Sequence, residues 1–142
     1  FPLIDKFMQD TIRIARRQGY VETMDGYPLA VPSNAPYKGV DYRIQGTAGS
    51  IVKDAMISTH SYLKKMNKEH PELDGQLILN VHDELVFDFN TVGVKESLLM
   101  SVVERIKRLM EAAGSNMGSG LVTPVDVSRV DKRWSESIGV AL

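Results

Sequence analysis

Apolar residues recur at three- and four-residue steps in three segments of the chain, and this spacing predicts three amphipathic helices. The first covers residues 3–18 and ends before Gly19, which suits a helix C-cap. The second covers 41–67 and the third 94–113. The apolar stripe predicted for the second helix consists of Ile44, Ala48, Ile51, Val52, Ala55, Met56, Thr59, Tyr62 and Leu63.

Alternating or continuous apolar runs between these segments predict two β-hairpins. The runs 20–24 and 27–31 flank Asp25-Gly26, a strong hairpin-turn signal. The runs 76–81 and 85–89 flank a polar tripeptide, and a last strand is expected within 121–130. This order indicates one α+β domain over residues 1–142, with long helices on one face of an antiparallel sheet.

The tripeptide of the second hairpin is His82-Asp83-Glu84. Strict alternation would place Leu77, Leu79 and Val81 on one face and other apolar residues opposite, as in a central strand. A polar tip facing water is the simpler interpretation of the turn, but such turns normally contain glycine. The alternative is a carboxylate held for Mg²⁺, which prefers oxygen ligands.

Two glycines in the second predicted helix are a further anomaly. Gly46 and Gly49 each cost about 1 kcal/mol relative to alanine within a helix. Their presence predicts that another group approaches the helix backbone closely.

Composition narrows the class of protein. The 142 residues are 43% hydrophobic and 25% charged, include no cysteine, and contain no apolar run of the length that spans a bilayer. These features predict a globular intracellular protein without disulfides and without a membrane partner. The chain begins at Phe1 without a signal-peptide pattern, so a processed product or a fragment is expected.

The net charge is −1, but the charges are segregated. Residues 38–68 carry six basic and two acidic side chains, whereas residues 69–88 carry six acidic and no basic ones. Either a polyanion track lies beside a cation site, or two solvated faces have opposite sign.

Four stretches resemble the family A DNA polymerases, the bacterial and phage DNA polymerase I group. They are RRQGYVETMDGYPLAVPS, YRIQGTAGSIVKDAM, VHDEL and GLVTPVDVSRVDKRWSES, in the family's order. The resemblance implies the C-terminal part of a right-hand polymerase palm with elements adjoining the fingers. It also implies template-directed DNA synthesis with primer-template DNA, a dNTP and two Mg²⁺ ions.

The resemblance implies roles for particular residues. Asp83 matches the catalytic aspartate that binds both metal ions, and Glu84 matches the acid beside it. His82 matches a residue at the primer end, and Gln45 a glutamine that reaches the minor groove. Arg43 and Lys53 are candidates for DNA phosphate contacts, or only solubilise the helix.

The chain departs from the family in two respects. Asp41, Tyr37 and the pair Tyr27-Pro28 replace residues that are commonly Asn or basic, which predicts a weaker hold on DNA. The strand with the partner aspartate and the fingers helix with its lysine are absent from these residues. We therefore expect the chain to be inactive until the N-terminal remainder of the polymerase is supplied in cis or in trans.

Three alternatives remain. The chain could be a non-catalytic interaction module on a palm scaffold, or the partner subunit of a split polymerase. It could also be a small metal-dependent hydrolase that adds His60 or His70 to the hairpin residues, although their spacing matches no known ligand pattern.

Overall fold

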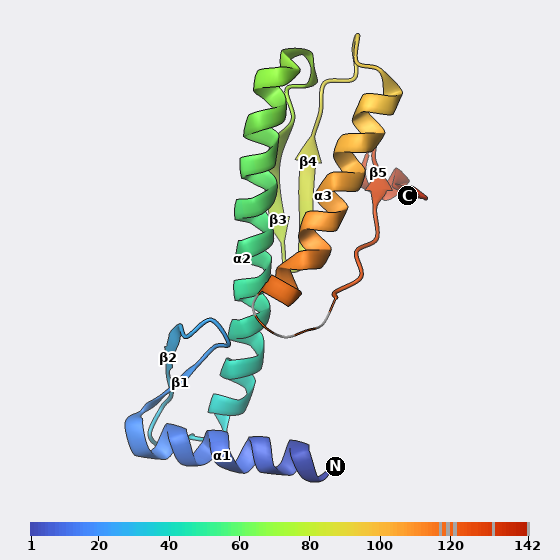
Figure 1. The fold of residues 1–142 in the computed structure, drawn as a ribbon. Helices are drawn as coiled ribbons and strands as arrows, with labels where there is room; N and C mark the ends of the chain where they lie inside the picture. Colours follow the sequence, from blue (N-terminus) through green and yellow to red (C-terminus); the bar gives the residue numbers. More distant parts are fainter. Residues whose placement is uncertain (117, 119, 121, 132, 142) are drawn as a thin grey trace. The chain divides into compact units, whose positions relative to one another are not determined.

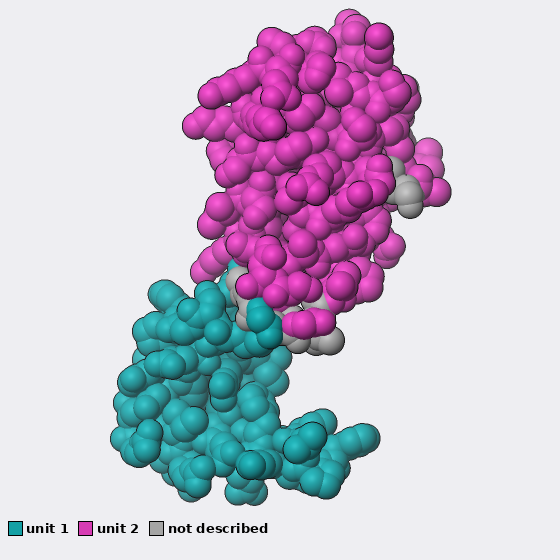
Figure 2. Space-filling model, viewed as in Figure 1, with its two compact units in different colours: residues 1–51, 117–119 teal, residues 52–116, 120–142 magenta. Residues whose placement is uncertain are grey.

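The computed structural model describes residues 1–116, 118, 120, 122–131 and 133–141 (Figure 1). The chain divides into two compact units, coloured separately in Figure 2. Unit 1 comprises residues 1–51 and 117–119, and unit 2 comprises 52–116 and 120–142. The long helix α2, Lys38–Glu69, contributes to both units. No helix among the described residues offers a stretch long and apolar enough to cross a lipid bilayer.

Unit 1 begins with α1, Pro2–Gln18, which confirms the first predicted helix. Proline suits the first turn of a helix because its nitrogen has no hydrogen to leave unpaired there. The helix ends at Gly19, whose left-handed backbone (φ 78°) lets its N–H donate to the carbonyl of Ala15 at 2.9 Å.

The first hairpin of unit 1 pairs β1, Tyr20–Glu22, with β2, Pro28–Ala30. Its core consists of Ala15, Val21 and Val31, with Leu29 and Tyr42 packed against them. The hairpin turn lies against α2, because the N–H of Met24 donates to the hydroxyl of Thr47 at 3.1 Å.

Gly46 is required by this packing. A Cβ atom added there would lie 2.4 Å from Cδ1 of Leu29 and 2.8 Å from Cγ2 of Thr23, so the close approach expected from the sequence is confirmed. A Cβ atom on Gly49 would meet nothing within 4 Å. The predicted apolar stripe is wrong at this end of α2, because Ile44 is 55% exposed and Ala48 is also exposed. The hairpin instead packs on another flank of the helix.

Unit 2 is built on the second hairpin, β3 (Gln76–Val81) paired with β4 (Glu84–Asp88). In Figure 1, α2 and α3 (Glu96–Asn116) lie on one side of this hairpin. The core between them contains Leu63 of α2 and Leu99, Val102 and Ile106 of α3, together with Leu73, and Phe87 and Phe89 pack against it. The two helices and the hairpin therefore form the expected α+β arrangement within this unit.

The sheet itself differs from the expectation in two ways. The described strands form three separate two-stranded sheets, not one sheet. The last strand, expected within 121–130, is reduced to β5, Ser128–Arg129, which pairs with β6, Ile138–Gly139. Leu121, the first residue of the expected strand, lies outside the described residues.

A β-bulge corrects the predicted faces of β3. Leu77 pairs with Phe87, but the register then shifts, and Leu79 pairs with Val86 and Val81 with Glu84. One extra residue, Ile78, therefore interrupts the regular alternation of side chains along the strand. The interpretation of β3 as a strand buried on both faces is wrong, since Ile78, Leu79 and Val81 are 57%, 48% and 36% exposed.

Candidate functional site

The candidate site is the turn between β3 and β4. Val81 pairs with Glu84, so His82 and Asp83 form a two-residue loop and Glu84 is already the first residue of β4. Such short loops fix the direction of their side chains, because the flanking ladder restrains both ends. The side chain of Asp83 is thus presented at the tip of a stiff hairpin.

The backbone of this turn adopts an unusual conformation. His82 has φ 56°, in the left-handed region, and Asp74 (φ 39°) is the other non-glycine residue with positive φ among the described residues. Hairpin turns whose first loop residue has a positive φ normally have glycine at that position. A side chain there costs about 1–2 kcal/mol, and such strain concentrates at functional sites.

The side chain of Asn80 forms a clasp on the turn, that is, a pair of hydrogen bonds to its backbone. Its side-chain amide donates to the carbonyl oxygen of His82 at 3.1 Å and to that of Glu84 at 3.3 Å. The two bonds tie the carbonyls on both sides of Asp83 to one side chain and so restrain the strained loop. Asn80 was not among the residues predicted for the site, although an amide two residues before a tight turn is a local signal for such a contact.

The three polar side chains of the turn are exposed. His82, Asp83 and Glu84 all face solvent, and within the described chain no hydrogen bond or ion pair involves their side chains. Two carboxylates with free oxygens on adjacent residues can bind a divalent cation or a cationic ligand. The surface beside them is apolar, with Leu79 and Val81 on the face that α2 and α3 leave uncovered.

The hairpin supplies only part of a metal site. No group of three or more His, Asp or Glu side chains that could hold an ion occurs among the described residues. The hydrogen-bond partner of His70 is Glu72, with Nδ1 at 3.3 Å from Oε1, and not a residue of the turn. His60 is an exposed residue of α2. The ligand set required by the hydrolase hypothesis is therefore not formed by the described side chains.

The candidate DNA-binding residues lie on α2. Gln45 is exposed and belongs to unit 1, and Lys53 is exposed and belongs to unit 2 with the hairpin. Arg43 of unit 1 has partners within the chain: its guanidinium lies 5.3 Å from the ring centroid of Phe7 and donates to the hydroxyl of Thr11 at 3.4 Å. These contacts tie α2 to α1.

Comparison with known proteins now places the chain. The profile of DNA polymerase family A matches residues 1–136. The chain belongs to this family. It is 32% identical to DNA polymerase I of Pseudomonas aeruginosa over 148 residues, which is 96% of the chain and 15% of the relative. DNA polymerase I of Chloroflexus aurantiacus is 28% identical and matches 100% of the chain with 15% of its own length.

A solved structure of the family agrees with this assignment. The POL domain of Pol1 from M. smegmatis, in complex with DNA primer-template and dNTP, superposes with a TM-score of 0.63 and 26% identity. The match covers 78% of this chain and 19% of that one. The chain thus spans about a sixth of the length of its polymerase relatives, and the resemblance found in the sequence is confirmed at the level of the family.

Proposed function

We propose that this chain is the C-terminal palm portion of a DNA polymerase and carries one of the two carboxylates that bind its catalytic metal ions. The observation that carries the proposal is the His82-Asp83 turn, in which an exposed carboxylate without a partner among the described residues sits on a strained, clasped loop. Membership of family A makes DNA synthesis the general activity to which this turn contributes.

The turn residues have distinct roles in this proposal. Asp83 would hold Mg²⁺, and Glu84 would add negative charge beside it. His82 contacts the primer terminus, which explains why a strained residue with a ring replaces glycine. When bound, two Mg²⁺ ions supply activation of the primer hydroxyl and stabilisation of the pyrophosphate leaving group.

The residues on α2 bind DNA in this proposal. Gln45 is exposed, and its amide can donate to the minor-groove acceptors that are common to all correct base pairs, so its contact tests base-pair geometry. Lys53 contacts a phosphate. Arg43 already has partners, so its contact with DNA requires its contact with Phe7 or Thr11 to loosen.

A second segment of polymerase completes the site. One exposed carboxylate pair on a single turn cannot hold two ions between attacking and leaving oxygens. The apolar face of β3 beside the turn, formed by Leu79 and Val81, is suited to being covered by that segment. The chain is then inactive alone, and the N-terminal remainder supplies the partner aspartate and the dNTP-binding lysine in cis or in trans.

Primer extension tests the proposal. The chain alone is compared with a chimera in which it replaces the matched residues of the Pseudomonas aeruginosa relative, with Mg²⁺, dNTPs and a primed template. We expect extension by the chimera and none by the chain alone. Extension by the chain alone would refute the need for a second segment. A folded chimera that binds primed DNA without extending it would favour the non-catalytic interaction module.

A further inference from the structure

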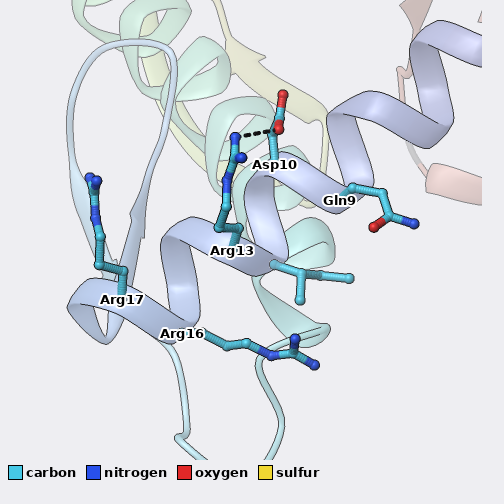
Figure 3. A pocket seen from close by; sticks show the side chains of 6 residues that line it. Gln9, Asp10, Arg13, Arg16 and Arg17 are labelled. Carbon is cyan, nitrogen blue, oxygen red and sulfur yellow. Dashed lines mark hydrogen bonds and ion pairs between the residues drawn. The ribbon is translucent and has the colours of Figure 1, made fainter.

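The exposed face of α1 carries the densest group of arginines in the chain. Arg13, Arg16 and Arg17 are three of its eight arginines, and they line an open hollow of about 600 Å³ together with Gln9, Asp10 and Ile12 (Figure 3). The opposite face of α1 is the packed one, since Thr11 and Ala15 are buried. The arginines are therefore displayed to solvent by the same helix that anchors unit 1.

Two of these guanidinium groups lack an anionic partner. Arg13 forms an ion pair with Asp10 at 2.7 Å, whereas no acceptor for Arg16 or Arg17 exists among the described residues. Cations in the last turn of a helix are favoured by the helix dipole. The C-cap of α1 is made by the backbone, since the N–H of Gly19 donates to the carbonyl of Ala15.

We propose that this face of α1, defined by Arg13, Arg16 and Arg17, binds the phosphodiester backbone of a nucleic acid. The guanidinium group matches phosphate oxygens in a bidentate fork, which makes arginine the preferred phosphate ligand. In Figure 3 the three side chains extend from the helix in different directions. This spread suits successive phosphates of a strand better than a single phosphate group.

The shape of the hollow selects this ligand over others. A nucleotide or other small ligand is normally enclosed on most of its surface, but every residue that lines this hollow comes from α1 and the hollow is open to solvent. A protein partner needs an apolar interface core, and Ile12 is the one apolar residue of the lining. A charged strand passing over the helix needs neither feature.

This inference rests on the proposed function only in taking nucleic acid as the polyanion. The α1 face belongs to unit 1 and the carboxylate turn to unit 2, so the two sites can be altered separately. Contacts of this kind position a nucleic acid without reading its sequence.

Binding of a labelled DNA duplex, measured by fluorescence anisotropy across a salt series, tests the proposal. The variant is Arg16→Gln/Arg17→Gln, and the matched control is Lys64→Gln/Lys68→Gln, which removes two exposed cations from a late segment of α2. Each lost phosphate contact lowers the slope of log affinity against log salt by about 1. We expect the arginine variant to lose about 2 in slope and more than about tenfold in affinity at roughly 100 mM salt, and the control to keep the wild-type slope.

A third variant should change the affinity for DNA in the opposite direction. Asp10→Asn removes the one anion of the hollow and releases Arg13, so we expect tighter binding and a steeper salt dependence. Equal losses in the arginine variant and the lysine control, or no loss in either, would overturn the proposal. So would displacement of the duplex by millimolar inorganic phosphate or dNTP, which would indicate a small-anion site, or an arginine variant that binds DNA normally but loses a protein partner.

The two proposals fail in distinguishable ways. Asp83→Asn should leave duplex binding by the α1 face unchanged while it abolishes primer extension by the chimera. Loss of duplex binding in Asp83→Asn to the same extent as in the arginine variant would show that the arginines do not form a separate site.

Discussion

Replacing His82 by glycine should stabilise the chain, although it removes a side chain from the proposed active site. His82 is held at φ 56°, which costs a residue with a Cβ atom about 1–2 kcal/mol. Glycine relieves this cost but adds about 0.5–1 kcal/mol of conformational entropy to the unfolded chain. The net gain is about 0.5–1 kcal/mol, or about 2–3 °C in melting temperature for a chain of this length.

Two controls separate backbone strain from loss of the ring. His82→Ala removes the ring but keeps Cβ, so we expect no gain in stability. Asp74→Gly changes the other described non-glycine residue with positive φ (39°), outside the turn, and should be stabilised in the same direction. Urea unfolding followed by circular dichroism gives the three free energies of unfolding on one scale.

The expected pattern includes a loss of function. In the chimera, His82→Gly should extend primers more slowly than wild type, whereas Asp74→Gly should not. Lower stability of His82→Gly together with higher stability of Asp74→Gly would refute the reasoning, because the histidine ring would then stabilise the hairpin and the strain would have no functional meaning.

Three other predictions concern packing, the turn and pH. Gly46→Ala should destabilise the chain by about 1–3 kcal/mol, since its Cβ would collide with the first hairpin, whereas Gly49→Ala should stabilise it by about 1 kcal/mol; urea unfolding measures both. Asn80→Ala should lower the free energy of unfolding by about 1 kcal/mol, because its hydrogen bonds to the turn are lost. Asn80→Asp cannot donate these bonds and should be destabilised as well. Wild-type stability of Asn80→Asp in urea unfolding would contradict the role of these bonds. The pKa of Glu111 is lowered mainly by its hydrogen bond from Lys107, so the folded state favours the carboxylate. The greater stability of wild type over Glu111→Gln should therefore be present at neutral pH and disappear as the pH falls through the lowered pKa. A stability difference that grows in acid would contradict this assignment.

Local patterns were sufficient to predict most elements of the fold. Apolar spacing located all three helices, and β3 has the predicted bounds, because these signals depend on residues close in sequence. The β-bulge at Ile78 could not be predicted, since no local signal marks one extra residue in a run that is apolar throughout. The face of α2 that packs in unit 1 was misassigned because Gly46, rather than an apolar residue, marks the contact.

The candidate site was predictable in composition but not in geometry. The sequence placed the tripeptide between two strands, and the structure has these residues exposed at the β3–β4 turn, as both interpretations of the turn expect. Positive φ at His82 and the clasp by Asn80 depend on strand register, which a sequence alone does not define. The partners of Arg43 come from a different helix, 32 residues or more away in the chain, so its role in linking α1 to α2 had no local signal.

The most direct test of the central claim is the effect of Asp83→Asn on the chimera, with Asp88→Asn as a control for an exposed acid on the same hairpin. Single-turnover incorporation and the dissociation constant for primed DNA are measured for both. We predict that Asp83→Asn slows incorporation by at least about 10³-fold while DNA affinity changes little, and that Asp88→Asn behaves as wild type. Incorporation at the wild-type rate in Asp83→Asn, or equal loss of rate and affinity, would show that this carboxylate does not bind the catalytic metal.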